Sequence, residues 1–242
     1  MLISIPDGGA LCEEQTVIDS LPLNDARILE LGCGRAGQTR LLAQRPGVRS
    51  VLALEVDALQ HAKNLALSDL PTVRFALGAA EAIPAPDASV DGVFLFKSLH
   101  HVPAALMDQA FAEIDRVLVP GGFVYVSEPV FDGAYNDVLR LFHDEQAVRT
   151  AAFHAIERAV ASARFTLLSE TFFRARVHFP DFAAFERNVI NVTHTDHRLS
   201  ASVLAEVRSR FDAHLTEDGA QFAAPMRVDI LKKSTHQSRS AP

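Results

Sequence analysis

Short apolar runs alternate with amphipathic stretches through the first half of the chain, and this alternation constrains the fold more than any other feature. The apolar runs have strand length and end in polar or glycine residues: 27–31, 51–55, 73–77, 92–96 and 123–126. Helical spacing of apolar residues follows at 38–44, 58–67 and 104–118. Strands that alternate with helices predict a parallel sheet with helices on both faces.

The last third of the chain has a different pattern. Strand-like alternation is found at 172–179 and 226–231, and helix-forming stretches are 139–163, 182–192 and 201–214. We interpret this part as two more strands that carry inserted helices. The prediction is therefore an α/β, Rossmann-like, doubly wound and mostly parallel seven-stranded sheet with a C-terminal helical cap insertion. One domain over 1–242 would have its core at 26–130, a cap and substrate region at 131–225 and its last strand at 226–233.

Composition limits the choice of partner and compartment. The 242 residues carry a net charge of −7, which argues against nucleic acid or an anionic membrane as the main partner. The start of the chain lacks the pattern of a signal peptide, and no apolar stretch reaches membrane-spanning length. Cytoplasmic residence is the expectation. Oligomeric state cannot be read from the sequence, and a homodimer is compatible with it.

Metal binding is not expected. Cys12 and Cys33 are the only cysteines and form no CxxC pair. His194 and His197 are three residues apart, which would suit two ligands on a helical turn, but their segment has the pattern of a loop.

A glycine-rich loop, ELGCGRAG (30–37), follows the first predicted strand directly. Gly32, Gly34 and Gly37 allow a tight turn and close approach of a ligand to the backbone. Nicotinamide and flavin sites also use GxGxxG, with a diphosphate at the helix N-terminus. The acidic Glu30 before the glycines favours a ligand with a positive amino group instead.

A second anchor is Glu55, at the end of the second predicted strand and 21 residues after Gly34. A carboxylate at that place can accept hydrogen bonds from both hydroxyls of a ribose. Asp57 is a rival for the role, and a solvated carboxylate at the strand end is the alternative. Together the two anchors indicate a cationic amino acid joined to a nucleoside.

With these residues in place, the chain resembles the class I S-adenosylmethionine (SAM)-dependent methyltransferases, in particular the ubiquinone-biosynthesis-like small-molecule branch (methyltransferase domain 11 type). The resemblance covers about 26–130. Five pieces carry it in order: ILELGCG (28–34), LEVD (54–57), GAAEAIPAPDASVDGV (78–93), KSLHHV (97–102) and RVLVPGG (116–122).

The resemblance implies SAM as methyl donor, S-adenosylhomocysteine as product and a small-molecule acceptor. Glu30, Gly32 and Gly34 would hold the methionine part, and Cys33 and Gly37 of the same loop would also belong to the cofactor site. The remaining contacts would come from three places: Glu55 and Val56 at the ribose and adenine, Ala80 and Glu81 along the adenine edge, and Phe96, Lys97 and Ser98 on the sulfonium side. The family often has glycine where this chain has Ala36, and an acidic residue where it has Ala79.

Candidate catalytic residues follow the fourth and fifth predicted strands. Methyl transfer is an in-line displacement, which needs a base when the acceptor carries a proton. His100 and His101 titrate near neutral pH and suit that role. Glu128 lies on the same edge of the sheet and could orient a histidine. Capping or packing under the cofactor is the alternative for all three.

The cap region offers polar residues that we place on one helix, so that Arg140, His143 and Asp144 would share a face that could contact a substrate. A solvated helix surface is the alternative interpretation. Tyr135, Asn136 and Glu145 belong to the same predicted helix.

Three other functions compete with methyl transfer to a small molecule. A protein that binds SAM as a sensor or partner subunit would share the loop but not need His100, His101 and Glu128. A nicotinamide oxidoreductase would need a YxxxK-like pair, which the chain lacks. An amino-methylating nucleic-acid enzyme usually has a (D/N/S)PP(Y/F)-like motif where this chain has KSLHH.

Overall fold

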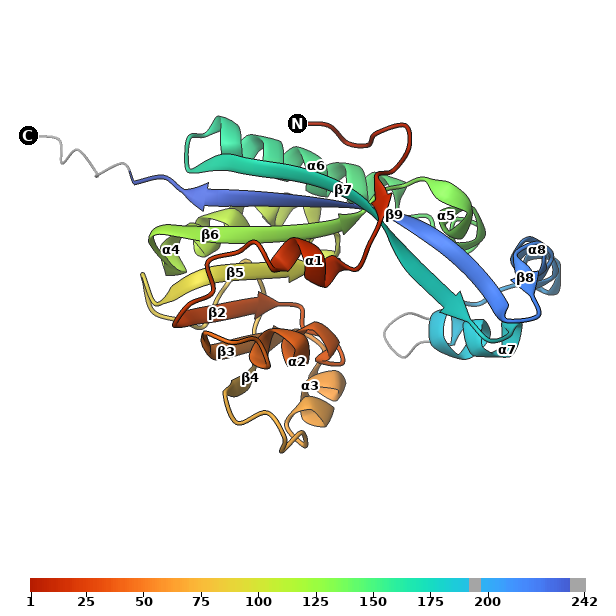
Figure 1. The fold of residues 1–242 in the computed structure, drawn as a ribbon, viewed down its shortest axis with the longest axis horizontal. Coiled ribbons are helices and arrows are strands. Elements are labelled where there is room, and N and C mark those ends of the chain that lie inside the picture. Colours follow the sequence, from red (N-terminus) through yellow and green to blue (C-terminus); the bar gives the residue numbers. More distant parts are fainter. Residues whose placement is uncertain (192–196, 236–242) are drawn as a thin grey trace, which may run out of the picture.

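The computed structural model describes residues 1–191 and 197–235. Within these residues the chain forms one nine-stranded mixed sheet, with strand order β1-β7-β9-β6-β5-β2-β3-β4 and β8 paired to β9 (Figure 1). The strands are β1 (Ala10–Leu11), β2 (Ala26–Leu31), β3 (Val48–Glu55), β4 (Val73–Leu77), β5 (Val90–Phe96), β6 (Leu118–Pro129), β7 (Phe165–Phe179), β8 (Leu215–Thr216) and β9 (Gly219–Lys233).

The helices lie between the strands. The α-helices are α1 (Glu14–Ile18), α2 (Gly37–Ala43), α3 (Ala58–Asn64), α4 (Met107–Val117), α5 (Gly133–Leu139), α6 (Gln146–Ala161), α7 (Phe182–Phe185) and α8 (Ala201–Asp212). Three shorter segments are the 3₁₀ turns η1 (Leu99–His101) and η2 (Ala104–Leu106) and the π-helical turn η3 (Glu186–Ile190). No helix in the described ranges is long and apolar enough to cross a membrane.

The Rossmann-like, mostly parallel sheet is confirmed. In the order in which they lie in the sheet, strands β4, β3, β2, β5 and β6 all run parallel to their neighbours in this group. β9 runs antiparallel to β6, β7 and β8. From β2 the chain moves outward to β3 and β4 and then crosses back to β5 on the other side of β2. This switch point places a ligand site at the carboxyl ends of β2 and β5.

The predicted strand number of seven was wrong. The structure adds β1 and β8, each two residues long. β1 pairs with β7 across more than 160 residues of sequence, and β8 forms a tight hairpin with β9. Two-residue strands leave no periodic signal, because their pairing depends on the partner strand.

Helices on the two faces of the sheet enclose two cores. Val124 and Val126 of β6 pack under α4 and α6, while Phe123 and Tyr125 of the same strand face α1 and α2. The alternation follows from the two-residue period of a strand. Buried on both faces, β6 is the apolar run that the sequence shows.

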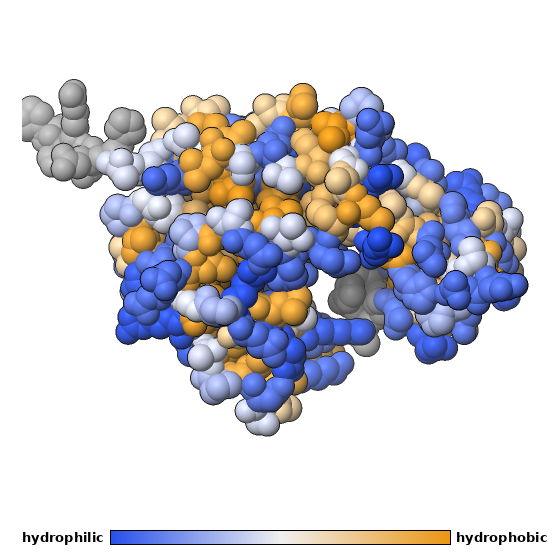
Figure 2. Space-filling view, in the orientation of Figure 1, coloured by the Kyte–Doolittle hydropathy of each residue, from blue (hydrophilic) through white to orange (hydrophobic). Residues whose placement is uncertain are grey.

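The cap is a lobe with a core of its own. β7 and β9 are each 15 residues long and continue beyond the sheet, where α5, α7, η3 and α8 pack against their far ends (Figure 1). Phenylalanines dominate this third core: Phe179, Phe182, Phe185, Phe211 and Phe222. Figure 2 shows the surface hollowed between this lobe and the part of the molecule that carries α2 and α3.

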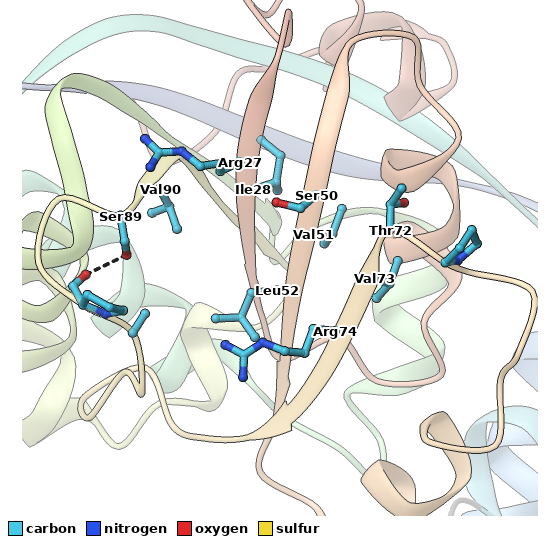
Figure 3. A pocket seen from close by; sticks show the side chains of 13 residues that line it. Arg27, Ile28, Ser50, Val51, Leu52, Thr72, Val73, Arg74, Ser89 and Val90 are labelled. Carbon is cyan, nitrogen blue, oxygen red and sulfur yellow. Dashed lines mark hydrogen bonds between the residues drawn. The ribbon is translucent and has the colours of Figure 1, made fainter.

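A groove of about 300 Å³ lies at the opposite, amino-terminal edge of the sheet (Figure 3). No helix connects β4 to β5, so this part of the sheet has a loop in place of a covering helix. Arg27 borders the groove and forms an ion pair with Asp91. The groove is therefore remote from the carboxyl ends where the sequence places its ligand.

Candidate functional site

The glycine-rich loop connects β2 to α2 at the switch point. Gly32 has φ 74°, and a Cβ there would lie 2.8 Å from the Cβ of Ser98, so only glycine fits. A Cβ built on Gly34 or Gly37 would meet nothing within 4 Å. The loop therefore leaves open space beside its backbone. Ala36 stands in the left-handed region at φ 59°, a conformation that glycine adopts at lower cost than alanine.

Glu30 lies near the end of β2, two residues before Gly32. Glu30 is 1 % exposed, and its Oε2 has no hydrogen-bond partner among the described residues. Burial, opposed by the Thr39 hydroxyl and supported by the nearby charge of Glu55, raises the pKa of Glu30 to about 8. A buried carboxyl with an unused oxygen is costly alone, and an ammonium group would satisfy it.

Glu55 ties the loop to the end of β3. Its Oε2 accepts from the Gly34 N–H at 2.8 Å, and its Oε1 accepts from the N–H groups of Val56 and Asp57 at 2.8 and 2.9 Å. Asp57, the rival for the ribose, instead caps α3 by accepting from the Leu59 N–H. A carboxylate has about four acceptor positions, so Glu55 keeps capacity for a ligand hydroxyl.

The remaining predicted cofactor residues surround the same edge. Ser98 donates from Oγ to the carbonyl of Leu31, and Lys97 has φ 54° while its N–H is held by Ser127 O. Val56 is 68 % exposed, which leaves its side chain available to an adenine. The other members lie as follows: Cys33, Ala80 and Phe96 are buried, and Glu81 is half-buried with its carbonyl bound by Gln109.

On the acceptor side, His100 and Glu128 form a buried pair. Glu128 lies near the end of β6, and it accepts hydrogen bonds from the Leu99 N–H at 2.9 Å and from His100 Nδ1. Both side chains are 4 % exposed. Burial opposes the charged imidazole, but the carboxylates of Glu128 and Glu145 outweigh it and raise the pKa of His100 to about 9. At neutral pH His100 is a cation held between carboxylates.

Glu145 and Arg149 complete this network, and sequence reasoning gave them no such role. Glu145 Oε1 lies 3.5 Å from His100 Nε2 and 2.8 Å from His143 Nε2, and Oε2 accepts from Arg149. Burial of Glu145 is outweighed by His100 and Arg149, so its pKa is lowered.

The single helix predicted for Tyr135 to Glu145 was wrong. α5 ends at Leu139 and α6 begins at Gln146, whose N–H is bound by Asp144. The break directs Glu145 inward to His100. Arg140 lies over the ring of Phe131, so it does not share a helix face with Asp144.

His101 differs from its neighbour. It is exposed, and its ring centre lies 4.1 Å from that of His100. Partial burial and the charge of His100 lower the pKa of His101, so it is neutral at pH 7. A neutral, accessible imidazole can accept a proton, whereas His100 is protonated and enclosed.

The described residues contain one group of potential metal ligands, His100, His101 and Glu145, whose ligand atoms lie within 4.8 Å of one another. The His100 and Glu145 atoms in this group already have protein partners. Of the histidines in the predicted THTDH segment, His194 lies outside the described residues and His197 contacts the ring of His143.

The site geometry agrees with a cationic amino acid joined to a nucleoside, and the comparisons decide the class. Residues 28–122 match a family described as Methyltransferase domain. The segment 28–122 therefore carries the sequence features of a class I SAM-dependent methyltransferase domain. SAM is therefore its cofactor, and the orphaned oxygen of Glu30 beside the open loop fits the ammonium group of SAM.

Two relatives from Mycolicibacterium smegmatis match this methyltransferase core. A fatty-acid O-methyltransferase is 34 % identical over 44 % of this chain and 39 % of its own length. A probable S-adenosylmethionine-dependent methyltransferase is 34 % identical over 49 % of this chain and 45 % of its own length. The chain thus spans less than half the length of these relatives.

Solved structures extend the fold likeness over the cap. The YcgJ protein of Bacillus subtilis has a TM-score of 0.60 at 17 % identity, covering 92 % of this chain and 98 % of its own. The [4+2]-cyclase SpnF has a TM-score of 0.56 at 20 % identity, covering 92 % of this chain and 80 % of its own. SpnF is named a cyclase, so the methyltransferase fold alone does not assign a reaction.

Proposed function

We propose that this chain transfers a methyl group from SAM to a small-molecule acceptor and releases S-adenosylhomocysteine. The observation that carries the proposal is the buried Oε2 of Glu30, which has no partner in the described residues and lies next to a glycine loop with open space. The fatty-acid O-methyltransferase relative supports an acceptor of small size, and the net charge of −7 argues against nucleic acid.

On the donor side, the chain binds and orients. Glu30 would take the ammonium group, the backbone of Gly32 to Gly37 the methionine chain, and Glu55 the ribose. When bound, SAM supplies an electrophilic methyl group. Because the residues are preset on the ends of β2, β3 and β5, little of the binding free energy is spent on ordering the site.

On the acceptor side, we assign different roles to the two histidines. His101 would accept the proton of an acceptor hydroxyl or amine, because it is neutral and exposed. His100 would position it, fixed between Glu128 and Glu145. Glu128 would hold His100 and the turn η1 through the Leu99 N–H. An acceptor that is already an anion would need only alignment.

The proposal is tested by binding and turnover. Calorimetry should show that SAM binds one-to-one, and incubation with a pool of small acceptors should convert it to S-adenosylhomocysteine with a product one methyl group heavier. Glu55→Ala should weaken SAM binding about tenfold or more, since the ribose contact and the Gly34 anchor are both lost.

The matched control is Asp57→Ala, which removes the cap of α3 and should leave SAM affinity within about threefold of the wild type. Stronger loss in Asp57→Ala than in Glu55→Ala would reverse the ribose assignment. Binding of SAM without turnover over a broad acceptor pool would favour the alternative, a SAM-binding sensor or partner subunit.

A further inference from the structure

A second cavity lies behind Glu128, on the α6 face of the sheet. It has a volume of about 180 Å³ and is bordered by the start of α6, the ends of β6 and β9, and the N-terminal segment. Its polar lining residues are Ser4, Glu128, Gln146, Arg149, Thr150 and Arg227. The cavity thus has a lining of polar and apolar residues and holds two guanidinium groups.

Arg227 is the unusual member of this lining. The residue is 3 % exposed, and the central carbon of its guanidinium lies 4.5 Å from the centre of the Phe153 ring. Within the described part of the chain its only side-chain hydrogen bond runs from Nε to Asp229 Oδ2, at 2.8 Å. The two terminal nitrogens, which carry four of its five N–H donors, are left for something in the cavity.

The other charged groups around Arg227 already have protein partners. Glu128 is engaged by His100 and the Leu99 N–H, and Arg149 by Glu145 and Asn136. Burial, only partly offset by Arg227, raises the pKa of Asp229 to about 6, so this carboxyl is mostly ionised at neutral pH and pairs with Arg227 through Nε. Arg227 therefore has more hydrogen-bond donors than its protein partners use.

We propose that this cavity binds a carboxylate, held by the terminal nitrogens of Arg227. Two parallel N–H donors match the two oxygens of a carboxylate, and such a pair is strong when it is buried. The volume suits a carboxylate on a small organic group, with the Phe131 ring as an apolar wall. The proposal goes beyond methyl transfer, since it requires neither SAM nor turnover.

The test uses benzoate and benzamide as probes of the full chain, without SAM. Calorimetry or ligand-observed NMR should show saturable binding of benzoate and at least tenfold weaker binding of benzamide, which has the same shape without the charge. Equal affinity for the two probes, or no saturable binding of benzoate, would overturn the proposal without touching the SAM site.

Variants locate the site. Arg227→Gln should weaken benzoate binding about tenfold or more, and Arg227→Lys should retain part of it. Arg208→Gln is the matched control, because Arg208 also lies over a phenylalanine but on the exposed face of α8. Unchanged benzoate affinity in Arg227→Gln would overturn the assignment, and if that variant fails to fold, the comparison of benzoate with benzamide still decides.

The carboxylate could belong to the methyl acceptor or to a separate ligand. Once the acceptor screen has yielded a substrate, inhibition by benzoate that excess acceptor relieves would assign the pocket to the acceptor's own carboxylate. Benzoate binding with unchanged initial rates would assign it to a separate carboxylate ligand. Both results support a carboxylate site, and they name its source.

Discussion

At the residue scale, buried neighbours set the charge states of Glu30 and His100. Glu30 lies near the end of β2, and His100 lies in η1, which follows β5. That Glu30 has a raised pKa, and that His100 is a cation between two carboxylates, depends on burial and on Glu145. Glu145 is 45 residues from His100 in sequence, and no periodic pattern links the two.

Binding of SAM should release a proton from Glu30. With a pKa of about 8 in the unliganded protein, Glu30 is mostly protonated at pH 7, and a bound ammonium group favours its carboxylate form. Affinity should therefore rise from pH 6 to about pH 8 and then level off. Calorimetry in buffers of different ionisation enthalpy measures the proton count.

Glu30→Gln supplies the comparison, since glutamine cannot release the proton. The variant should bind SAM about tenfold or more weakly and show no proton release near pH 7. If the wild type and Glu30→Gln release equal numbers of protons, Glu30 does not contact the ammonium group.

His101 should act as the base for an acceptor that carries a proton. His101→Gln should lower kcat/KM by about 10² to 10⁴ while SAM affinity stays the same. Because the pKa of His101 is lowered from 6.5, the acid limb of the wild-type pH profile should lie below pH 6.5. His154→Gln, which changes an exposed histidine paired with Glu157, is the control. Turnover at the wild-type rate in His101→Gln would leave alignment as the mechanism.

At the element scale, β2 and β5 are buried strands with mostly apolar sequences, and they differ from their predicted ranges by only one or two residues. β4 is a partly exposed edge strand, and it begins and ends at the predicted residues. The break between α5 and α6 has neither proline nor glycine to mark it. It arises because Glu145 is drawn to His100 and Arg149, a tertiary interaction that overrides helix propensity.

The loop between β2 and α2 should tolerate a methyl group at one glycine and not at another. Gly32→Ala should lower the free energy of unfolding by about 1–3 kcal/mol, because the new Cβ meets Ser98 and φ is positive. Gly37→Ala should change it by less than about 1 kcal/mol, since its Cβ enters open space. Denaturant unfolding of the ligand-free variants measures both, and equal losses would contradict the loop geometry.

At the scale of the whole molecule, the sequence separated a cofactor-binding core from a different last third. The parallel half follows from alternation of strand and helix, whereas β7 and β9 are twice as long as their sequence patterns indicated. Each of these strands contributes to three cores, the two on the faces of the sheet and the one in the cap. Because the buried neighbours change partway along each strand, the apolar residues of the strand follow no single period.

Because the cap has a core of its own, we expect it to unfold independently of the SAM-binding part of the sheet. Phe211 is fully buried in the cap core, so Phe211→Ala should cost about 3–5 kcal/mol there, open the cap in hydrogen exchange and reduce methyl transfer. SAM affinity should stay near the wild-type value. Phe94 belongs to β5 and is buried in the core that faces α1 and α2, so Phe94→Ala should weaken SAM binding as well. Loss of SAM affinity in Phe211→Ala would show that the two lobes unfold together.

The long antiparallel pair β7–β9 also has a consequence for engineering. In the described part of the chain, the cap lobe is joined to the sheet by β7, by β9 and by the segments that link α5 to β6 and to α6. A foreign lobe grafted between the same points of these strands would keep the register that fixes Arg227 opposite Glu128. We therefore expect that the cap lobe can be replaced on β7 and β9 by lobes that bind different acceptors, while the SAM-binding part of the sheet stays unchanged.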